Sequence, residues 1–157
     1  MISVIIRTMT HNEIQYIGAK WLKRHKRNLV VHNCPYVAEN LVTLNGTGET
    51  PDIIGWNYCN STMIEVKRTR QDFLKDKKKF FRENSTYSMG NYRLYLCPID
   101  LININEIPEK WGLLYIDESG KIEIMVNPEK QDSYYTAEIS MLLSIIRRLR
   151  NGENKLV

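Results

Sequence analysis

Hydrophobic positions recur along this chain with two periods, and their alternation predicts a mixed α/β domain. Helical spacing predicts a helix over residues 11–26, behind the N-cap signature Thr10-His11-Asn12-Glu13, and further helices over residues 71–83 and 137–150. Cap residues before Pro108 predict a short helix at residues 105–109. Extended apolar runs predict strands at residues 29–31, 36–44, 51–56, 62–67, 92–97, 111–117 and 121–126. The resulting order is helix, strands, helix, strands, helix.

The runs at residues 51–56 and 62–67 predict an antiparallel hairpin with residues 58–61 as its loop. In that pairing Asp52 lies opposite Lys67, and Ile54 lies opposite Glu65. Because strand side chains alternate between two faces, Asp52, Glu65 and Lys67 then share one face. A register slip of one residue would send Asp52 to the other face. The candidate site therefore depends on the register of this hairpin.

Composition favours one globular domain over residues 1–157, since 43% of the residues are hydrophobic, which is enough for a core. No apolar run approaches the roughly 18 residues that a membrane span needs. Residues 1–6 are too short, and lack the charged leader, for a secretory signal. We therefore expect a cytoplasmic protein without membrane contact. Cys34, Cys59 and Cys97 lie far apart without zinc-ligand spacing, so we expect reduced thiols.

The formal net charge of +4 is unevenly distributed. Residues 66–82 hold eight basic and two acidic side chains, a local charge of +6, so the remainder of the chain sums to −2. A basic segment directly after Glu65 suits a polyanion such as nucleic acid. The alternative interpretation is a solvated, lysine-rich helix face.

Two carboxylates and a lysine on one face are suited to phosphodiester hydrolysis. Mg²⁺ needs only one or two carboxylates when water and substrate fill its other positions, and Asp52 and Glu65 would supply them. The main-chain carbonyl of Val66 is a natural third oxygen ligand. Lys67 could orient or deprotonate the attacking water if its pKa is lowered, or it could neutralise charge on the phosphate.

Pro51-Asp52 followed by Glu65-Val66-Lys67, set between helices, resembles the PD-(D/E)xK nucleases of the restriction-endonuclease-like superfamily. The sequence of residues 36–126 is similar to those of small phage and bacterial repair-type members of this superfamily. The resemblance implies a mixed central sheet flanked by helices. It also implies a Mg²⁺-dependent endo- or exodeoxyribonuclease, with Mn²⁺ as a substitute, that acts in DNA processing or repair in a bacterial or phage-infected cell.

Members of this superfamily often add a third acid, and three residues are candidates for it. Glu13 could enter the site, or it could complete a capping box with Thr10. Glu39 lies on a predicted strand, where an exposed carboxylate is equally ordinary. Glu49 lies beside Pro51 in a glycine-rich loop and is the least constrained.

Five basic side chains are the candidate DNA contacts: Arg68, Arg70, Lys75, Lys78 and Lys79. The helix that follows contains Asp72 and Asp76 in its first two turns. We expect these acids to stabilise the helix dipole rather than to take part in catalysis. His11 is expected at a surface or capping position.

The chief rival hypothesis is a nucleic-acid-binding or accessory protein that keeps the fold without cleavage. A structural or partner-binding α/β protein is a third alternative, although it leaves the basic segment unexplained. The sequence leaves open whether the protein is a homodimer and whether its substrate is single-stranded, duplex or branched DNA.

Overall fold

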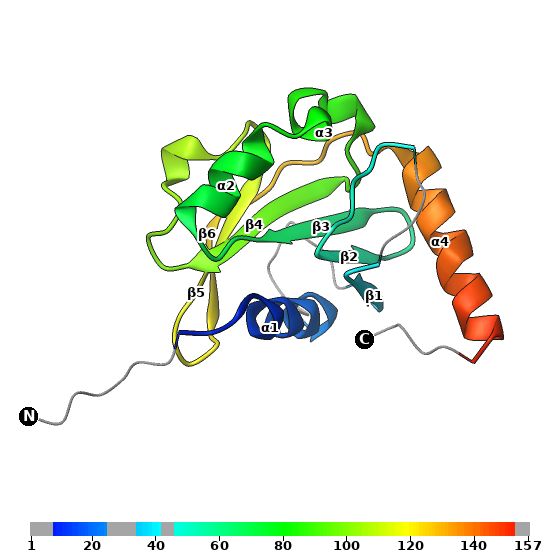
Figure 1. Ribbon diagram of the computed structural model, residues 1–157, viewed down its shortest axis with the longest axis horizontal. Coiled ribbons are helices and arrows are strands. Elements are labelled where there is room, and N and C mark those ends of the chain that lie inside the picture. The colour runs from blue at the N-terminus through cyan, green and yellow to red at the C-terminus, as the bar shows by residue number, and fades with distance from the viewer. Residues whose placement is uncertain (1–7, 25–33, 42–45, 153–157) are drawn as a thin grey trace, which may run out of the picture.

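A six-stranded mixed sheet with helices on both faces forms the body of the protein (Figure 1). The computed structural model describes residues 8–24, 34–41 and 46–152. The strands follow the chain order β1-β2-β3-β4-β5-β6 and are Tyr36–Glu39, Ile53–Trp56, Ser61–Val66, Tyr92–Pro98, Gly112–Ile116 and Ile122–Val126. The α-helices α1 to α4 are His11–Arg24, Arg70–Lys77, Phe80–Glu83 and Tyr135–Arg150, and the 3₁₀ turns η1 and η2 are Ser85–Tyr87 and Ile104–Glu106.

Strand directions make the sheet mixed: β3, β4 and β5 run parallel, and the other neighbouring pairs are antiparallel. The expected mixed α/β class is thereby confirmed. The predicted strand at residues 29–31, and the ends of the predicted elements at residues 25–26 and 42–44, lie outside the described residues. Within the described part of the chain, no helix is both long and apolar enough to cross a bilayer.

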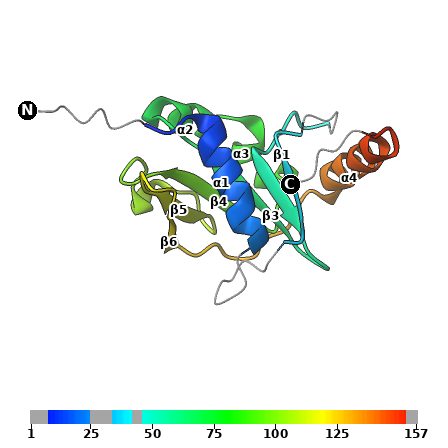
Figure 2. The same ribbon diagram turned by 90° about the horizontal axis from the view of Figure 1, so that it is seen from below.

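Helix α1 covers one face of the sheet and crosses its strands (Figure 2). Its apolar stripe places Ile14, Ala19 and Leu22 against alternate residues of the strands, including Ile64 and Val66 of β3. Since these β3 residues point toward α1, the alternate residues Met63 and Glu65 must point to the opposite face. The core under α1 thus fixes the direction in which the candidate acid faces.

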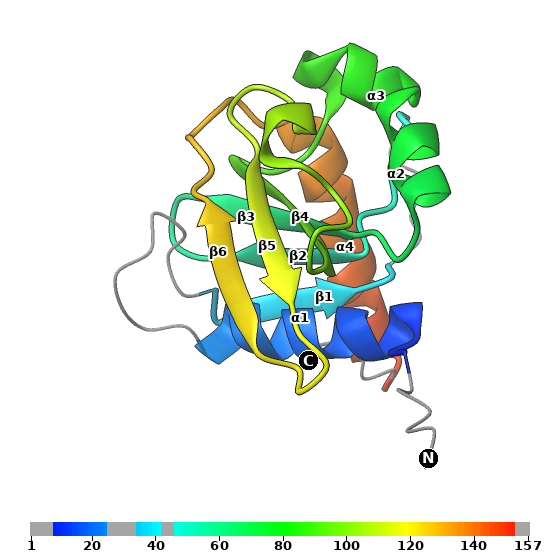
Figure 3. The same cartoon turned by 90° about the vertical axis from the view of Figure 1, so that its left-hand side faces the viewer.

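The opposite face is covered by two separate groups of side chains. Near β4 and β5, Phe73 of α2 packs with Met63, Tyr95 and Trp111. Near β1 and β2, α4 packs through an apolar side that includes Met141. Figure 3, in which β5 and β6 face the viewer, shows α4 behind the sheet and α2 and α3 at its edge. Glu65 lies on this same face, between the two clusters.

The predicted helix over residues 71–83 is divided in two. Helix α2 ends at Lys77, Lys79 adopts an extended backbone with φ −69° and ψ 143°, and α3 begins at Phe80. The interruption turns Phe81 and Arg82 inward, whereas Phe80 is exposed. The prediction of one continuous amphipathic helix was therefore wrong, because α3 packs in a different direction from α2.

The predicted register of the β2–β3 hairpin was wrong by two residues. Ile53 pairs with Ile64 and Ile54 with Met63, so continuing the register places Asp52 opposite Glu65 rather than Lys67. The reason is a tighter turn: the side-chain oxygen of Asn57 accepts a 3.0 Å hydrogen bond from the backbone N–H of Asn60. A shift of two residues preserves the faces, so the predicted sharing of one face survives.

Candidate functional site

Asp52 stands at the start of β2 with one carboxylate oxygen already engaged. Its Oδ2 accepts a 2.8 Å hydrogen bond from the backbone N–H of Val66, and His11 Nε2 lies 3.5 Å from the same oxygen. The hydrogen bond to Asp52 raises the pKa of His11, against the opposing effect of burial. The site therefore also contains His11, which the sequence analysis had assigned to a surface or capping position.

Pro51 offers no backbone donor to the Val66 carbonyl at this end of the hairpin. Continuing the register places Pro51 opposite Val66, and proline has no N–H to donate to a facing carbonyl. In an extended strand the N–H and C=O of one residue point to the same side. The Val66 carbonyl therefore points toward the same side as the N–H that binds Asp52. This geometry fits its predicted use as an oxygen ligand.

Glu65 and Lys67 form a buried ion pair. Lys67 Nζ lies 3.1 Å from Glu65 Oε2, and the two side chains are only 7% and 4% exposed. Burial raises the pKa of Glu65 to about 6, although Lys67 and Arg82 oppose the increase. For Lys67, burial would lower the pKa, but Glu65 and Asp76 outweigh it and hold the pKa above its usual value. Of the two roles that the sequence left open for Lys67, the raised pKa favours the cation over the base of lowered pKa.

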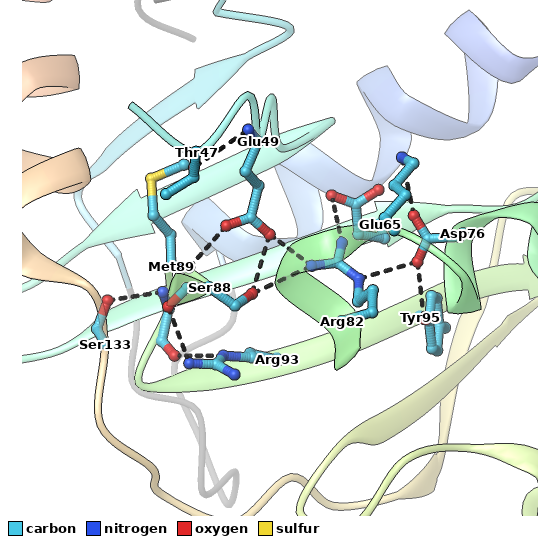
Figure 4. A network of polar contacts seen from close by, with 12 residues as sticks. Thr47, Glu49, Glu65, Asp76, Arg82, Ser88, Met89, Arg93, Tyr95 and Ser133 are labelled. Atoms are coloured by element: carbon cyan, nitrogen blue, oxygen red, sulfur yellow. Dashed lines mark hydrogen bonds and ion pairs between the residues drawn. The ribbon is translucent and has the colours of Figure 1, made fainter. Parts of the chain in front are cut away.

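Arg82 joins three buried carboxylates (Figure 4). Its Nη1 lies 2.5 Å from Glu49 Oε1, and its Nε lies 2.9 Å from Asp76 Oδ2. Its Nη2 lies 3.1 Å from Glu65 Oε1, but this last contact is an ion pair without hydrogen-bond geometry. Oε1 is therefore the less firmly held oxygen of Glu65.

Asp76 is the most heavily paired acid of this network. Its oxygens lie 2.9 Å from Lys79 Nζ and 3.4 Å from Lys67 Nζ, and one accepts a 2.8 Å hydrogen bond from the Tyr95 hydroxyl. Burial would raise the pKa of Asp76, but Arg82, Lys67 and Lys79 outweigh it and hold the pKa well below its usual value. This burial corrects the expectation that Asp76 acts only on the helix dipole. Its spacing of three from buried Phe73 was the signal that it faces inward.

None of the three candidate third acids joins Asp52 and Glu65 directly. Glu13 forms the capping box, since its Oε2 accepts a 2.7 Å hydrogen bond from the Thr10 N–H. Glu39 pairs with Ile53, so it lies on the α1 face of the sheet, opposite Glu65. Glu49 is buried and accepts hydrogen bonds from Arg82, Ser88 and the backbone N–H of Met89. Glu49 is thus linked to Glu65 through Arg82.

The predicted DNA contacts divide into free and engaged cations. Arg68, Lys75 and Lys78 are exposed. Arg70 instead forms a bidentate pair with Glu106, at 2.8 and 2.7 Å, and Lys79 pairs with Asp76. Arg68 borders a pocket of about 480 Å³, whose other lining residues include Thr69 and Ile14. The lining includes Ile14 and Ile116 of the core under α1 and none of Asp52, Glu65 and Lys67, so this pocket lies on the α1 face of the sheet, opposite Glu65.

The donor set available to a metal ion is small. Within residues 8–24, 34–41 and 46–152, no three His, Cys, Asp or Glu side chains are arranged to hold one ion together. Asp52, Glu65 and the Val66 carbonyl offer two carboxylates and one backbone oxygen. This set matches Mg²⁺, which keeps several waters, better than a metal that requires a full protein cage.

Comparisons with known proteins bear on the fold alone. No protein-family model matches the chain, and no curated protein matches it. Among solved structures, the SPO1766 protein of unknown function from Silicibacter pomeroyi is similar, with a TM-score of 0.52 and 20% sequence identity. The match covers 75% of this chain and 79% of that one. The two proteins thus share a mixed α+β architecture.

Proposed function

We propose that the protein is a Mg²⁺-dependent nuclease that hydrolyses phosphodiester bonds in DNA, on a restriction-endonuclease-like fold. One observation carries the proposal: Asp52 and Glu65 face each other across the β2–β3 hairpin, with Lys67 3.1 Å from Glu65. A site that served only to bind phosphate would gain nothing from two such acids, because each carboxylate repels the ligand. A cation bound between them removes that repulsion.

Asp52, Glu65 and the Val66 carbonyl would hold the metal ion. When bound, Mg²⁺ supplies a water of lowered pKa and draws charge from the phosphate oxygens. Asp52 still has its Oδ1 to offer, since the Val66 N–H and His11 both approach Oδ2. Glu65 offers Oε1, whose contact with Arg82 lacks hydrogen-bond geometry.

Two cations of the chain would act on the phosphate. Lys67 keeps its proton, because Glu65 and Asp76 raise its pKa, so it stabilises negative charge rather than removing a proton. His11 has a raised pKa beside Asp52 and can hold a proton at Nε2. Arg68, Lys75 and Lys78 are exposed and available for the flanking phosphates.

Cleavage assays on the purified protein test the proposal. The substrates are supercoiled, linear, single-stranded and branched DNA, each with Mg²⁺, with Mn²⁺ and with a chelator. We expect metal-dependent cleavage that Asp52→Asn, Glu65→Gln and Lys67→Met each reduce by about 100-fold or more. Glu39→Gln is the matched control, since Glu39 lies on the other face of the sheet and its loss should leave cleavage unchanged. Absence of cleavage on every substrate by the folded wild-type protein would refute the nuclease.

A non-catalytic nucleic-acid-binding protein is the second candidate, and one observation favours it. Both oxygens of Glu65 already face cations of the chain, Lys67 and Arg82, so the negative charge of Glu65 is balanced without a metal. This candidate predicts DNA binding that strengthens as salt falls, is insensitive to chelator and is never followed by cleavage. Arg68→Ala and Lys78→Ala should weaken such binding, whereas Glu65→Gln should not.

A further inference from the structure

Helix α4 is apolar on two sides, although the described structure covers only one of them. Ala137, Met141 and Ile145 pack on the β1–β2 end of the sheet. Six further apolar side chains are between 36% and 61% exposed: Tyr135, Ile139, Leu142, Leu143, Ile146 and Leu149. Figure 1 shows α4 at one end of the molecule, with its outer side away from the sheet. A helix that is apolar on both sides is typical of one that is buried on both sides.

The exposed residues follow a heptad pattern. Tyr135, Ile139, Leu142, Ile146 and Leu149 are separated alternately by four and three positions. Such spacing produces a straight seam along a helix that pairs with another helix. Isoleucine occupies one heptad position and leucine the other at four of the five sites, so the seam is apolar along its whole length. The seam is therefore suited to a partner helix of the same kind.

We propose that the outer seam of α4 is a dimer interface, and that its occupant is α4 of a second copy of this chain in antiparallel orientation. The proposal is independent of the nuclease activity. With roughly 100 Å² from each of the six side chains, two copies would bury about 1,200 Å² in total, which reaches the lower end of specific interfaces. A self-complementary patch of this kind produces a closed dimer with two-fold symmetry.

Charge selects the antiparallel orientation. The exposed Arg147 and Arg150 lie in the last turn of α4, while the exposed Glu129, Lys130 and Asp132 before its first turn carry a net charge of −1. Parallel helices would place the arginines of both copies side by side. Antiparallel helices bring each arginine pair toward the acids of the other copy, and they also oppose the two helix dipoles.

Sedimentation over a concentration series of the full chain tests whether the seam dimerises. We expect a dimer, and Ile139→Glu should weaken it by at least about 30-fold, the effect of losing one hot-spot side chain. Ile99→Glu is the matched control, because Ile99 and Ile139 are both 56% exposed and Ile99 lies away from α4. Circular dichroism should find both variants folded. A wild-type monomer at all concentrations, or a dimer that Ile139→Glu leaves intact, would overturn the proposal.

Single cysteines test the orientation in a Cys59→Ser background, which removes the exposed thiol. Thr136→Cys and Arg150→Cys proteins, mixed and oxidised, should form a mixed disulfide, whereas Arg150→Cys alone should not crosslink. Efficient crosslinking of Arg150→Cys alone would overturn the antiparallel arrangement. Binding of a monomeric wild-type protein to anionic vesicles, lost in Ile139→Glu, would instead identify the seam as a membrane-surface face and refute the dimer.

Discussion

Arg82 of α3 places its Nη2 3.1 Å from Oε1 of Glu65 on β3, so a residue outside the Glu65-Val66-Lys67 motif joins Lys67 in opposing the rise that burial causes in the pKa of Glu65. The same guanidinium holds Glu49 and Asp76, and it is only 3% exposed. The break between α2 and α3 is what brings Arg82 to this position. Arg82 thus links the folding of the basic segment to the electrostatics of the candidate site.

Removal of Arg82 should destabilise the protein strongly. Arg82→Ala leaves three buried carboxylates without their common cation, a loss that costs about 3–5 kcal/mol in comparable buried pairs. Urea denaturation followed by circular dichroism measures the free energy of unfolding. Arg70→Ala is the control: its pair with Glu106 is 45% exposed on the arginine side, so we expect a far smaller cost than for Arg82→Ala. Equal costs for the two variants would contradict the role given to Arg82.

Asp76 should make the protein sensitive to acid. Its folded-state pKa lies below the ordinary value of 3.8, because Arg82, Lys67 and Lys79 outweigh burial. The unfolded chain therefore binds this proton first as pH falls, so the contribution to stability is complete above the ordinary pKa and is lost below it. In Asp76→Asn the free energy of unfolding should fall less steeply between pH about 4 and 2.

Denaturation at several pH values measures that slope. Asp72→Asn removes one carboxylate from the exposed side of the same helix and serves as the control. An Asp76→Asn slope that matches wild type would show that Asp76 is not held as an anion by its three cations. The Tyr95 hydroxyl can still donate to the new amide oxygen, so the variant should fold.

The three cysteines should differ sharply in reactivity. Cys59 is exposed in the β2–β3 turn, whereas burial raises the pKa of Cys34 to about 11 and that of Cys97 to about 12. Thiolates are the reactive species, so at pH 8 a disulfide reagent should label one thiol rapidly in the native protein and three after denaturation. Cys59→Ser should abolish the rapid phase. A rapid phase that persists in this variant would place Cys34 or Cys97 nearer the surface.

Sequence reasoning predicted the local elements well because their signals are local. The N-cap at Thr10, the helix that contains Met141 and Ile145, and the β5–β6 hairpin are all present as expected. The candidate acids also share a face as expected, although the register is shifted by two residues. That shift arose from the Asn57 turn, whose side-chain hydrogen bond has no clear periodic signature.

The ion network could not be predicted because it depends on contacts distant in sequence. His11 lies 41 positions before Asp52, and Arg82 lies 33 positions after Glu49. A charged residue in a basic segment resembles a solvated one until the chain brings a carboxylate to it. Arg82 and Arg68 belong to the same segment, yet one is buried among acids and the other is exposed. Burial of Arg82 therefore divides the basic segment into a structural cation and exposed ones.

Lys67 should matter for both stability and cleavage, and a double mutant separates the two. Lys67→Met leaves Glu65 without its 3.1 Å partner and should cost about 1–3 kcal/mol, the penalty for a buried group that loses its hydrogen bond. Adding Glu65→Gln removes the negative charge that Lys67 balanced, so the double mutant should recover part of this loss. Denaturation of both single mutants and the double mutant gives the coupling energy.

In the same proteins, cleavage should not recover when stability does. If Lys67 and Glu65 both act on the phosphodiester, the Lys67→Met/Glu65→Gln double mutant regains stability while its cleavage stays at the level of the single mutants. If the pair is purely structural, the double mutant should instead regain cleavage together with its free energy of unfolding. Since removing one charge leaves the other buried, only this combined measurement distinguishes a lysine that stabilises charge on the phosphate from one that merely neutralises Glu65.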